Sequence, residues 1–390
     1  MKIAILIERM FPGALPKVVG AQSSYLTKLG HEVEVLVIMQ GGLPHGNYQF
    51  DDFLDGVTIR ELSREVPLAR LSAFRFPFFN FFSVYHLAGP FYVPRVIKNG
   101  EYDIVIALGA LTSLTAWALR RRRRIPYLTF HWDPLSKIIP KVYSGRLPGF
   151  LYWCLLRVGI WLDRFVVRNS LVTLTTSEVN ASALRPSGVP GAVEIVPMGC
   201  YPLDKLPDRR GDYLLTLERW DNGNMPHMLL EVLGKLSKPV ELKVAGFWSD
   251  ESLRDSFMKL LASSGLSDRV EVLGPVSESH LKELFLHARA WLHPKAEPSL
   301  ITMPMLEAAT CGCPIVIPRE KREGSSDFLH GTSAFFPLSG DIDEYTDCVD
   351  KLVTDERLAY EIGRAGWEVA RQYSWENHVT RIENIIRERL

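Results

Sequence analysis

Cysteine is scarce in this chain, and its scarcity limits the kinds of protein that the sequence can encode. Five cysteines occur among 390 residues, an odd number with no regular spacing. A disulfide framework needs paired cysteines, and Cys311 and Cys313 alone do not form a metal-binding signature. We therefore expect a protein of the reducing cytoplasm without structural disulfides.

Long apolar runs are also missing. No stretch reaches the roughly 18–20 apolar residues that a membrane-spanning helix needs. Residues 1–7 contain no small-residue cleavage site, so we expect a first strand there and not a signal peptide. Basic and acidic residues balance at 45 each, and no nucleic-acid-binding motif accompanies the basic ones. These absences argue against a membrane-spanning protein and against nucleic acid as a partner.

The balanced total hides an uneven distribution of charge. Residues 1–205 carry 23 Lys and Arg against 15 Asp and Glu, a balance of +8. The remaining residues carry 22 against 30, a balance of −8. Such asymmetry indicates that the first half faces an anionic surface.

Short apolar runs alternate with amphipathic segments along the whole chain. Strands are expected in the first half at residues 2–7, 33–39, 104–107, 127–130, 171–175 and 193–196. Between the first two, a helix is expected at residues 22–29, ending at Gly30. The polar residues 204–212 indicate a linker, after which the alternation restarts with an expected strand at 213–217. This rhythm predicts an α/β fold with two Rossmann-like domains, each built on a doubly wound parallel sheet.

Residues 291–318 form the most informative segment. Pro304 is tolerated only in the first turn of a helix, and Gly312 followed by Pro314 marks the end of that helix. The loop at residues 299–302 therefore leads into a helix N-terminus, where N–H groups and the helix dipole favour an anion. Glu307 lies about one turn into this helix, close enough to accept hydrogen bonds from hydroxyl groups of a ligand at its mouth.

This segment resembles the donor-site signature of retaining glycosyltransferases of the GT-B fold, family 4. The positions that match in order are Pro304, Glu307, Ala308, Gly312, Pro314, Ile315 and Val316. The resemblance implies that Glu307 binds the ribose of a nucleotide sugar. It also implies that loop amides face the diphosphate, here those of Ser299, Leu300, Ile301 and Thr302. Ser299 departs from the pattern, because the family has a sugar-facing glutamate at this position. Taken alone, the segment is also compatible with an ordinary strand–helix–strand unit.

The resemblance covers nearly the whole chain. Its other matching segments are residues 30–33, 125–133, 196–199 and Trp375. It implies the GT-B architecture, in which two Rossmann-like domains face each other across a cleft. The acceptor domain is expected at residues 1–205 and the nucleotide-sugar donor domain at 206–374. A C-terminal helix at 375–390 is expected to pack back on the first domain.

Arg219 ends the first expected strand of the second domain. The family has an arginine here and a lysine five residues later. Together they offset the negative charge that grows on the leaving diphosphate as its bond to the sugar breaks. Arg219 matches the arginine, whereas Asn224 replaces the lysine. An amide can donate a hydrogen bond but cannot offset charge. Arg219 is also compatible with a plain role in a surface ion pair.

His131 follows an expected buried strand, and in the family this histidine lies beside the transferred sugar. The same position also suits a hydrogen-bonded core histidine. Gly13 lies in the first strand-to-helix loop, where the family uses two glycines for close backbone approach. Gly246 and Gly274 end two strands of the second domain, where they would allow backbone to approach the nucleotide or would simply permit a turn.

No cofactor or metal is expected. The sequence has no DxD motif and no cluster of histidine and acidic residues that suggests a metal. Enzymes of this family usually need none, because helix N-termini and basic side chains take the role of a metal.

Aromatic residues are concentrated in the first half. A dense run spans residues 74–92, and an expected helix at 149–168 holds Tyr152, Trp153, Trp161 and Phe165 among arginines. Five consecutive arginines occupy residues 120–124. Aromatic and basic side chains on one helix suit an anionic membrane surface. The alternative is that the aromatics belong to the core and the arginines to a solvated helix end.

Together these observations predict a retaining glycosyltransferase that moves a sugar from a nucleoside diphosphate to an acceptor hydroxyl. Arg219 would stabilise the leaving diphosphate, Glu307 would bind ribose and His131 would position the sugar. The acceptor is not identified; a lipid-linked or membrane-proximal glycan is one candidate, with the enzyme peripheral on the inner face of the membrane. The alternative is a catalytically degenerate GT-B protein that binds nucleotide or a partner without transferring sugar. An epimerase or phosphorylase on this fold finds no distinguishing motif.

Overall fold

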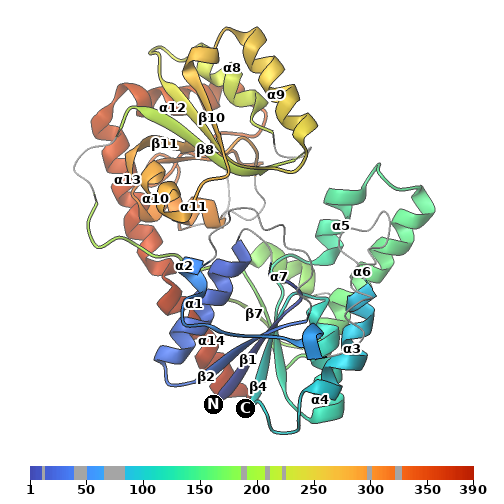
Figure 1. Cartoon of the computed structure of the whole chain (residues 1–390). Helices are drawn as coiled ribbons and strands as arrows, with labels where there is room; N and C mark the ends of the chain where they lie inside the picture. The colour runs from blue at the N-terminus through green and yellow to red at the C-terminus, as the bar shows by residue number, and fades with distance from the viewer. Residues whose placement is uncertain are drawn as a thin grey trace. The chain divides into compact units, whose positions relative to one another are not determined.

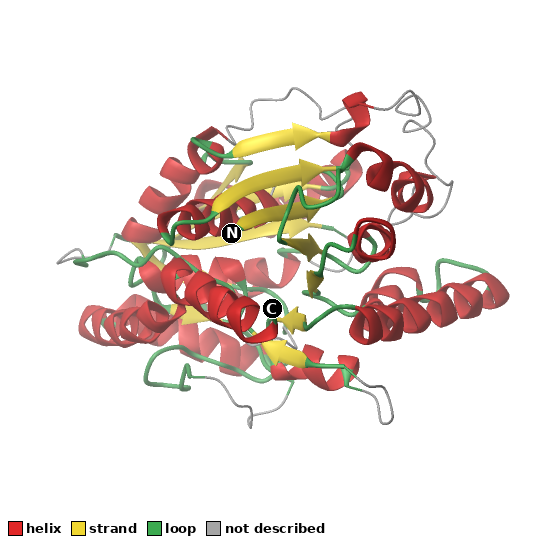
Figure 2. Cartoon of the chain, turned by 90° about the horizontal axis from the view of Figure 1, so that it is seen from below, coloured by secondary structure: helices red, strands yellow, loops and turns green. Residues whose placement is uncertain are grey.

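The computed structural model describes residues 1–10, 14–38, 51–65, 84–185, 191–206, 211–221, 225–296, 301–320 and 327–390. The polypeptide divides into two compact units, Met1–Pro197 with Trp375–Leu390, and Met198–Ser374. Each unit contains a parallel sheet flanked by helices (Figure 1, Figure 2). The predicted class, α/β with two doubly wound parallel sheets, is therefore confirmed.

The sheet of the first unit has the order β3-β2-β1-β4-β5-β6-β7 in the described residues. Its strands are β1 (Lys2–Ile7), β2 (Glu32–Val37), β3 (Thr58–Glu61), β4 (Ile104–Leu108), β5 (Tyr127–Phe130), β6 (Thr173–Thr175) and β7 (Val193–Ile195). Every neighbouring pair is parallel. The strand order reverses between β1 and β4, because β2 and β3 lie on one side of β1 and the later strands on the other. Open α/β sheets bind ligands at such a point, at the carboxyl ends of the strands.

Helices cover both faces of this sheet. They are α1 (Ala14–Lys28), α2 (Asp51–Leu54), α3 (Val84–Val96), α4 (Thr112–Arg123), α5 (Leu135–Tyr143), α6 (Gly149–Asn169), α7 (Glu178–Leu184) and α14 (Trp375–Arg389), with a 3-10 turn at Leu62–Glu65. Helices α1 and α14 pack together, as do α3 and α4 (Figure 1). Helices α5 and α6 form a hairpin that projects from the rest of the unit (Figure 1).

The second unit is smaller, with the strand order β10-β9-β8-β11-β12 in its described part. Its strands are β8 (Tyr213–Trp220), β9 (Glu241–Trp248), β10 (Val270–Gly274), β11 (Ala288–Leu292) and β12 (Ile315–Val316). Its helices are α8 (His227–Lys235), α9 (Glu251–Ser264), α10 (Glu278–His287), α11 (Met303–Thr310), α12 (Ile342–Thr354) and α13 (Glu356–Ala370), with 3-10 turns at Ser267–Arg269 and Arg371–Tyr373. In open α/β sheets of this kind, ligands bind at the carboxyl ends of the strands.

Alternation along β11 shows how the sheet separates two cores. Ala290 and Leu292 belong to one buried cluster, whereas Trp291 between them belongs to another. Successive residues of a strand point to opposite faces, so both faces of this sheet are buried under helices. A strand buried on both faces has a nearly continuous apolar sequence, which is why this segment was predictable.

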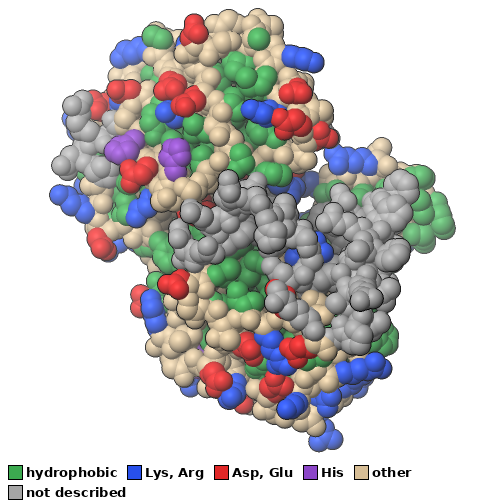
Figure 3. Space-filling view, in the orientation of Figure 1, with side chains coloured by type: hydrophobic (Ala, Val, Ile, Leu, Met, Phe, Trp, Pro, Cys, Tyr) green, Lys and Arg blue, Asp and Glu red, His purple; other side chains and the backbone are tan. Residues whose placement is uncertain are grey.

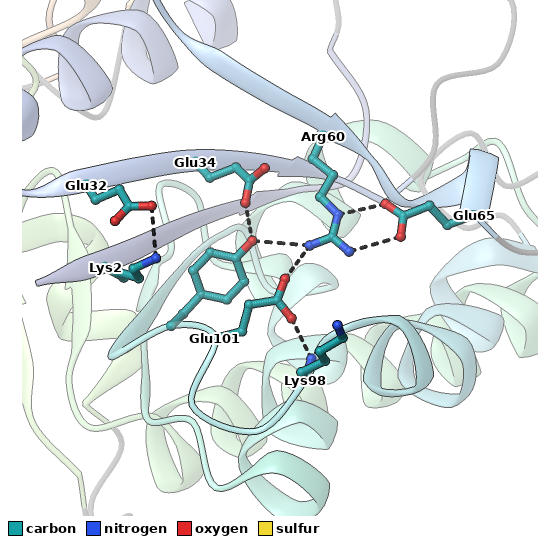
Figure 4. Close-up of polar contacts among 8 residues, drawn as sticks. Lys2, Glu32, Glu34, Arg60, Glu65, Lys98 and Glu101 are labelled. Atoms are coloured by element: carbon teal, nitrogen blue, oxygen red, sulfur yellow. Dashed lines mark hydrogen bonds and ion pairs between the residues drawn. The ribbon is translucent and has the colours of Figure 1, made fainter.

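A polar network around Arg60 of β3 joins one edge of the first sheet to the segment before β4 (Figure 4). The Arg60 guanidinium donates to both carboxylate oxygens of Glu65, at 2.7 and 2.9 Å, and to Glu101 Oε1 at 2.5 Å. Tyr102 links this network to Glu34 on β2 by donating a hydrogen bond to its carboxylate. Bidentate arginine–carboxylate geometry fixes orientation as well as charge. The network therefore ties β2 and β3 to the turn before β4.

Helix α14 brings the chain back to the first unit. His378 is 4% exposed and its Nδ1 donates to the carbonyl oxygen of Pro197 at 2.6 Å. Its ring also lies 5.5 Å, centroid to centroid, from that of Phe130, the last residue of β5. The helix therefore supports the strand that leads to His131.

Two expected boundaries are wrong. Helix α1 begins at Ala14, whereas the sequence pattern placed a helix start at residue 22. Every residue from Pro16 to Ser23 is buried, so this part of the helix has no exposed polar face and shows no amphipathic periodicity. Strand β9 continues to Trp248, past its expected end before Gly246. No helix in the described residues is long and apolar enough to cross a membrane.

Candidate functional site

His131 lies at the carboxyl end of β5 in the first unit. Its backbone N–H donates to the carbonyl oxygen of Leu174 on β6 at 2.7 Å, which continues the hydrogen-bond ladder between the two strands by one step. The residue is 2% exposed. A polar ring this well buried needs hydrogen-bond partners.

Asp163 supplies that partner from helix α6. Its Oδ1 atom lies 2.8 Å from His131 Nε2 and accepts the N–H of Leu135 at 2.9 Å. Its Oδ2 atom accepts the N–H of Ser136 at 2.9 Å. Leu135 and Ser136 form the first turn of α5, so the carboxylate also caps that helix and meets the positive end of its dipole.

These contacts set the state of the imidazole. Burial, the largest single influence, raises the pKa of Asp163, but the hydrogen bonds from His131 and Ser136 and the attraction to His131 outweigh it, so the pKa is lowered. An ionised carboxylate only accepts hydrogen bonds, and His131 Nε2 therefore carries the proton. The pair thus fixes the ring and leaves Nδ1 and the backbone carbonyl as the groups with which His131 could meet a ligand.

Sequence reasoning found His131 but missed Asp163. One signal was present. Asp163 is the single acidic residue among the 21 residues of α6, and it shares a helix face with the buried residues Gly159 and Leu162. A lone carboxylate on an apolar face needs a partner. The sequence does not say which partner, because the two residues are 32 positions apart.

Arg219 lies near the carboxyl end of β8 in the second unit. Its side chain is 72% exposed, and its Nη2 atom donates to Asp221 Oδ2 at 3.1 Å. An exposed ion pair contributes little to stability because water and salt screen it. Arg219 forms a surface ion pair and keeps most of its side chain accessible. The arrangement is therefore compatible with both roles considered above, diphosphate binding and a plain surface ion pair.

A second buried histidine–carboxylate pair lies beside Arg219. His293 follows β11, is 2% exposed, and its Nε2 atom lies 2.9 Å from Glu218 Oε1. His293 Nδ1 accepts the N–H of Lys295 at 3.1 Å, so the proton is on Nε2 and the ring is neutral. The hydroxyl of Tyr345 donates to the His293 carbonyl oxygen at 2.9 Å. Neither Glu218 nor His293 was predicted as a site residue.

Helix α11 has the predicted form. Thr302 is its N-cap residue and accepts the N–H of Met305 through Oγ1, and Pro304 lies in the first turn. Glu307 follows in the second turn and is half-buried. Gly312 has a φ of 64°, the left-handed conformation expected after this helix.

The cap reduces the number of amides open to an anion at this helix. Pro304 has no N–H, and the Met305 N–H is bonded to Thr302 at 3.3 Å. The amides of Ile301, Thr302 and Met303 are those with which this end of α11 could meet a phosphate. The anion site expected here therefore depends on the loop more than on the helix itself.

The two strand-end glycines differ in their surroundings. Gly246 lies inside β9 opposite Glu218, with a φ of 114°, and a Cβ there would meet the Glu218 carbonyl oxygen at 1.9 Å. This close approach of two strands explains its lack of a side chain without a ligand. Gly274 ends β10 with a φ of 68° and open space around it. A turn conformation explains that glycine equally well.

Four of the predicted positions lie outside the described residues: Gly13, Asn224, Ser299 and Leu300. In the second unit, Ile301, Thr302 and Glu307 share the segment that leads into and forms α11, and Arg219 is the penultimate residue of β8. His131 belongs to the first unit. The roles assigned to all these residues stay predictions.

No metal-binding cluster is found in the described ranges, where no group of three or more His, Cys, Asp or Glu side chains could hold an ion. The expectation of a metal-free site stays a prediction.

Two family models match the sequence over nearly its whole length. A glycosyl transferase 4-like domain matches residues 13–199, and a domain of glycosyl transferases group 1 matches residues 205–369. No curated protein matches the chain in sequence.

Solved structures match the fold over the full length. Sucrose-phosphate synthase from Thermosynechococcus elongatus is 16% identical with a TM-score of 0.77, covering 99% of this chain and 98% of that one. Anabaena HepE, solved with UDP and glucose, is 16% identical with a TM-score of 0.74 and full coverage of both chains. The lipopolysaccharide outer core galactosyltransferase WaaB is 14% identical with a TM-score of 0.68, again with full coverage. These similarities confirm the predicted GT-B fold.

Proposed function

Because the chain belongs to the group 1 glycosyltransferases of the GT-B fold, we propose that it transfers a sugar from a nucleoside diphosphate to an acceptor hydroxyl with retention of configuration. The bond between the anomeric carbon and the diphosphate breaks, and the diphosphate leaves with the bonding electrons. The acceptor oxygen forms the new bond on the same face, and its proton passes to the leaving diphosphate.

The observation that carries this proposal is the arrangement of the second unit. Arg219 presents an exposed guanidinium at one strand end, and α11 begins with a capped turn one helical turn before Glu307. A cation and backbone amides stabilise the charge that grows on the diphosphate as the sugar bond breaks. Glu307 accepts hydrogen bonds from the ribose hydroxyls. Asn224, Ser299, Leu300, Gly246 and Gly274 are proposed as further donor contacts, and Gly13 as one from the first unit.

His131 is proposed to position the transferred sugar. Its Nε2 proton is committed to Asp163 at 2.8 Å, so Nδ1 and the carbonyl oxygen are the groups available for a sugar hydroxyl. The ring is buried and anchored to two helices, and a rigid anchor keeps the sugar in one orientation. Asp163 acts through His131 and is therefore a positioning residue.

The donor and the acceptor are proposed from two other observations. HepE was solved with UDP-glucose, which makes uridine nucleotide sugars the first donors to test. We propose as acceptor a lipid-linked or membrane-proximal glycan, because exposed aromatic and arginine side chains gather on the first unit. No metal is included, since the basic and amide groups named above supply the positive charge.

The test is turnover with the nucleotide sugar that most raises the melting temperature of the protein. Arg219→Ala should lower turnover at least ~10²-fold, the usual loss for one preorganised electrostatic donor. Arg254→Ala is the matched control, because Arg254 is an exposed arginine of the same unit that pairs with Glu251. Asn224→Lys should raise turnover by restoring the charge that the family pattern has. Transfer that survives Arg219→Ala would sink this mechanism.

Nucleotide binding tests Glu307 separately. Glu307→Ala should weaken nucleotide binding by roughly 1.5–3 kcal/mol, as expected for hydrogen bonds to a charged group. Glu361→Ala, at an exposed site on α13, should leave the binding constant unchanged. Unchanged nucleotide affinity in folded Glu307→Ala protein would remove Glu307 from the site.

A second function is favoured by Asn224 and Ser299, which replace the lysine and the glutamate of the family pattern. On this reading the protein binds nucleotide but transfers nothing. Calorimetric binding of nucleotide by wild type, without product from any stabilising nucleotide sugar, would establish it.

A further inference from the structure

Helix α6 has two opposite faces with different tasks. Its inner face carries Asp163, the partner of His131, among buried apolar residues. Its outer face presents a line of large side chains to solvent: Phe150, Trp153, Arg157, Trp161, Arg164 and Arg168, here named the α6 stripe. Steps of three or four residues place them along one side of a helix. The stripe is roughly 27 Å long at the helical rise per residue.

The aromatic members of the α6 stripe are unusually exposed. Phe150 is 73% exposed, Trp161 57% and Trp153 53%. Hydrophobic side chains gather at the tip of the hairpin that α6 forms with α5 (Figure 3). The core alternative considered for these residues is therefore wrong for Trp153 and Trp161. Clustered exposed aromatics of this size mark an interaction surface.

Arginine side chains are interleaved with the aromatic rings. The Arg157 guanidinium lies 5.3 Å from the Trp153 ring centre. Arg157, Arg164, Arg168, Trp161 and Phe165 line a shallow groove of about 370 Å³. In the described part of the chain, none of these three arginines pairs with a carboxylate. The groove therefore offers three cations that no acidic residue of the described ranges neutralises.

The same chemistry continues beyond α6. Phe165 contacts Trp117 of α4 edge to face, with ring centres 5.5 Å apart. Arg121 lies over Trp117 at 5.7 Å, and Arg122 lies over Phe91 of α3 at 5.9 Å. Phe91 is itself 60% exposed. Lys and Arg side chains also gather near α4 in the space-filling view (Figure 3).

We propose that the α6 stripe docks the protein on an anionic lipid bilayer. Guanidinium groups bind phosphate in a bidentate way, and aromatic rings settle at the level of the headgroups. A long line that contains both aromatic and arginine side chains places both kinds at one depth, as a flat bilayer surface requires. Protein hot spots instead gather their aromatics at one centre with a polar rim.

Docking through α6 has a consequence for the proposed transfer. The helix that meets the lipid also carries the carboxylate that holds His131, so docking fixes the height of this part of the site above the bilayer. An acceptor sugar carried on a lipid would then reach His131 without leaving the membrane. This consequence rests on the proposed function, whereas the docking itself does not.

The test is sedimentation of the full chain with vesicles of phosphatidylcholine alone or with added phosphatidylglycerol. Wild type should bind the anionic vesicles, bind the neutral ones weakly, and lose binding between about 50 and about 300 mM salt, as surface charges are screened. Replacing Arg157, Arg164 and Arg168 by Gln should reduce partitioning roughly 100-fold. A second variant, Trp153→Ser with Trp161→Ser, should also weaken binding, since it removes the inserted rings.

A matched triple variant controls for total charge. Replacing Arg254, Arg357 and Arg364 by Gln removes three exposed arginines from the second unit and should change partitioning less than about threefold. Thermal unfolding and nucleotide binding should match wild type in all three variants, which separates a docking failure from a failure of the proposed function. Absent binding at low salt, equal loss in the control variant, or a dimer that the Trp variant abolishes without vesicle binding would each overturn the proposal.

Discussion

Two buried histidines end strands in the two units, and both bond through Nε2 to a carboxylate. His131 meets Asp163 at 2.8 Å, and His293 meets Glu218 at 2.9 Å. The difference lies in what else holds each partner. Asp163 comes from a helix and accepts two backbone N–H groups, whereas Glu218 comes from a strand of the same sheet and His293 accepts an N–H through its second nitrogen.

This difference separates an ionic anchor from a neutral one. In the first unit a carboxylate with a lowered pKa collects three donors, so the negative charge itself is required. In the second unit the ring is neutral, and the contact between His293 and Glu218 is a hydrogen bond from a neutral donor. The two histidine–carboxylate distances are similar, but we expect the stability of the first pair to depend more on the charge of the acid than that of the second. Replacing each acid by its amide distinguishes the two cases.

The largest effect is expected for Asp163→Asn. The amide has one acceptor oxygen for three donors, and its NH₂ group faces a backbone N–H. We expect a loss of roughly 3 kcal/mol in stability, as for breaking a buried charged pair, and at least ~10²-fold lower turnover at saturating donor. Thermal unfolding and initial-rate kinetics measure the two effects.

Glu383→Gln separates the effect on turnover from a general loss of packing. Glu383 is 7% exposed and pairs with His31 at 3.3 Å, before the amino end of β2 and away from the strand ends considered above. This variant should lose stability but keep the turnover of wild type. Equal turnover of Asp163→Asn and Glu383→Gln would show that Asp163 is structural only.

A buried histidine without a carboxylate sharpens the comparison, and His378 provides one. Burial lowers its pKa to about 4, although the hydrogen bond to the Pro197 carbonyl opposes that shift. Between an ordinary unfolded pKa of about 6.5 and this value, the unfolded chain binds a proton that the native state does not. Stability should therefore fall on acidification across this window, by at most about 1.4 kcal/mol per pH unit.

The measurement is the melting temperature from about pH 7 to about pH 4.5 for wild type and His378→Asn, which keeps a donor for Pro197 but does not titrate. The variant should show a flatter profile. His280→Asn, at an exposed histidine of α10, should keep the wild-type slope. A variant profile parallel to wild type would show that His378 does not cause the acid sensitivity.

The smallest effect is expected for Glu218→Gln. The amide oxygen accepts the His293 Nε2–H as well as a carboxylate does, so stability should change by less than about 1 kcal/mol. Glu218→Leu should cost about 1–3 kcal/mol, because it leaves a buried N–H without a partner. Chemical denaturation of both variants decides the matter. A large loss in Glu218→Gln would mean that the charge of Glu218 is needed and that the two pairs are alike.

Most strands and helices were predictable because their signals are local. The segment around Pro304, Gly312 and Pro314 specifies its own helix ends, and β11 is apolar because it is buried on both faces. Helix α1 was recognised only in part, since its buried first half has no polar face. Hydrophobic periodicity does not reveal a helix segment that is buried on all of its sides.

The residues of the candidate site also fall into two groups, those with a local sequence signal and those without one. His131, Arg219 and Glu307 could be proposed from motifs that lie within short segments. Asp163 and the pairing of Glu218 with His293 could not, because those contacts join residues 32 and 75 positions apart. Gly246 shows a different difficulty, since the close approach of Glu218 accounts for this glycine even without a ligand, and the sequence alone does not reveal that approach. Partners across a fold become visible only when the strands are placed side by side.

The return of α14 to the first unit makes the second unit an insertion, with consequences for biosynthesis. Residues 198–374 are translated between the two segments that complete the first unit. At about 5–20 residues per second, the first sheet waits roughly ten to forty seconds for the helix that covers α1 and supports Phe130. Throughout that interval the nascent chain exposes the apolar face of the first unit that α14 later covers. Chaperones would therefore meet this protein first at the surface that α14 later covers.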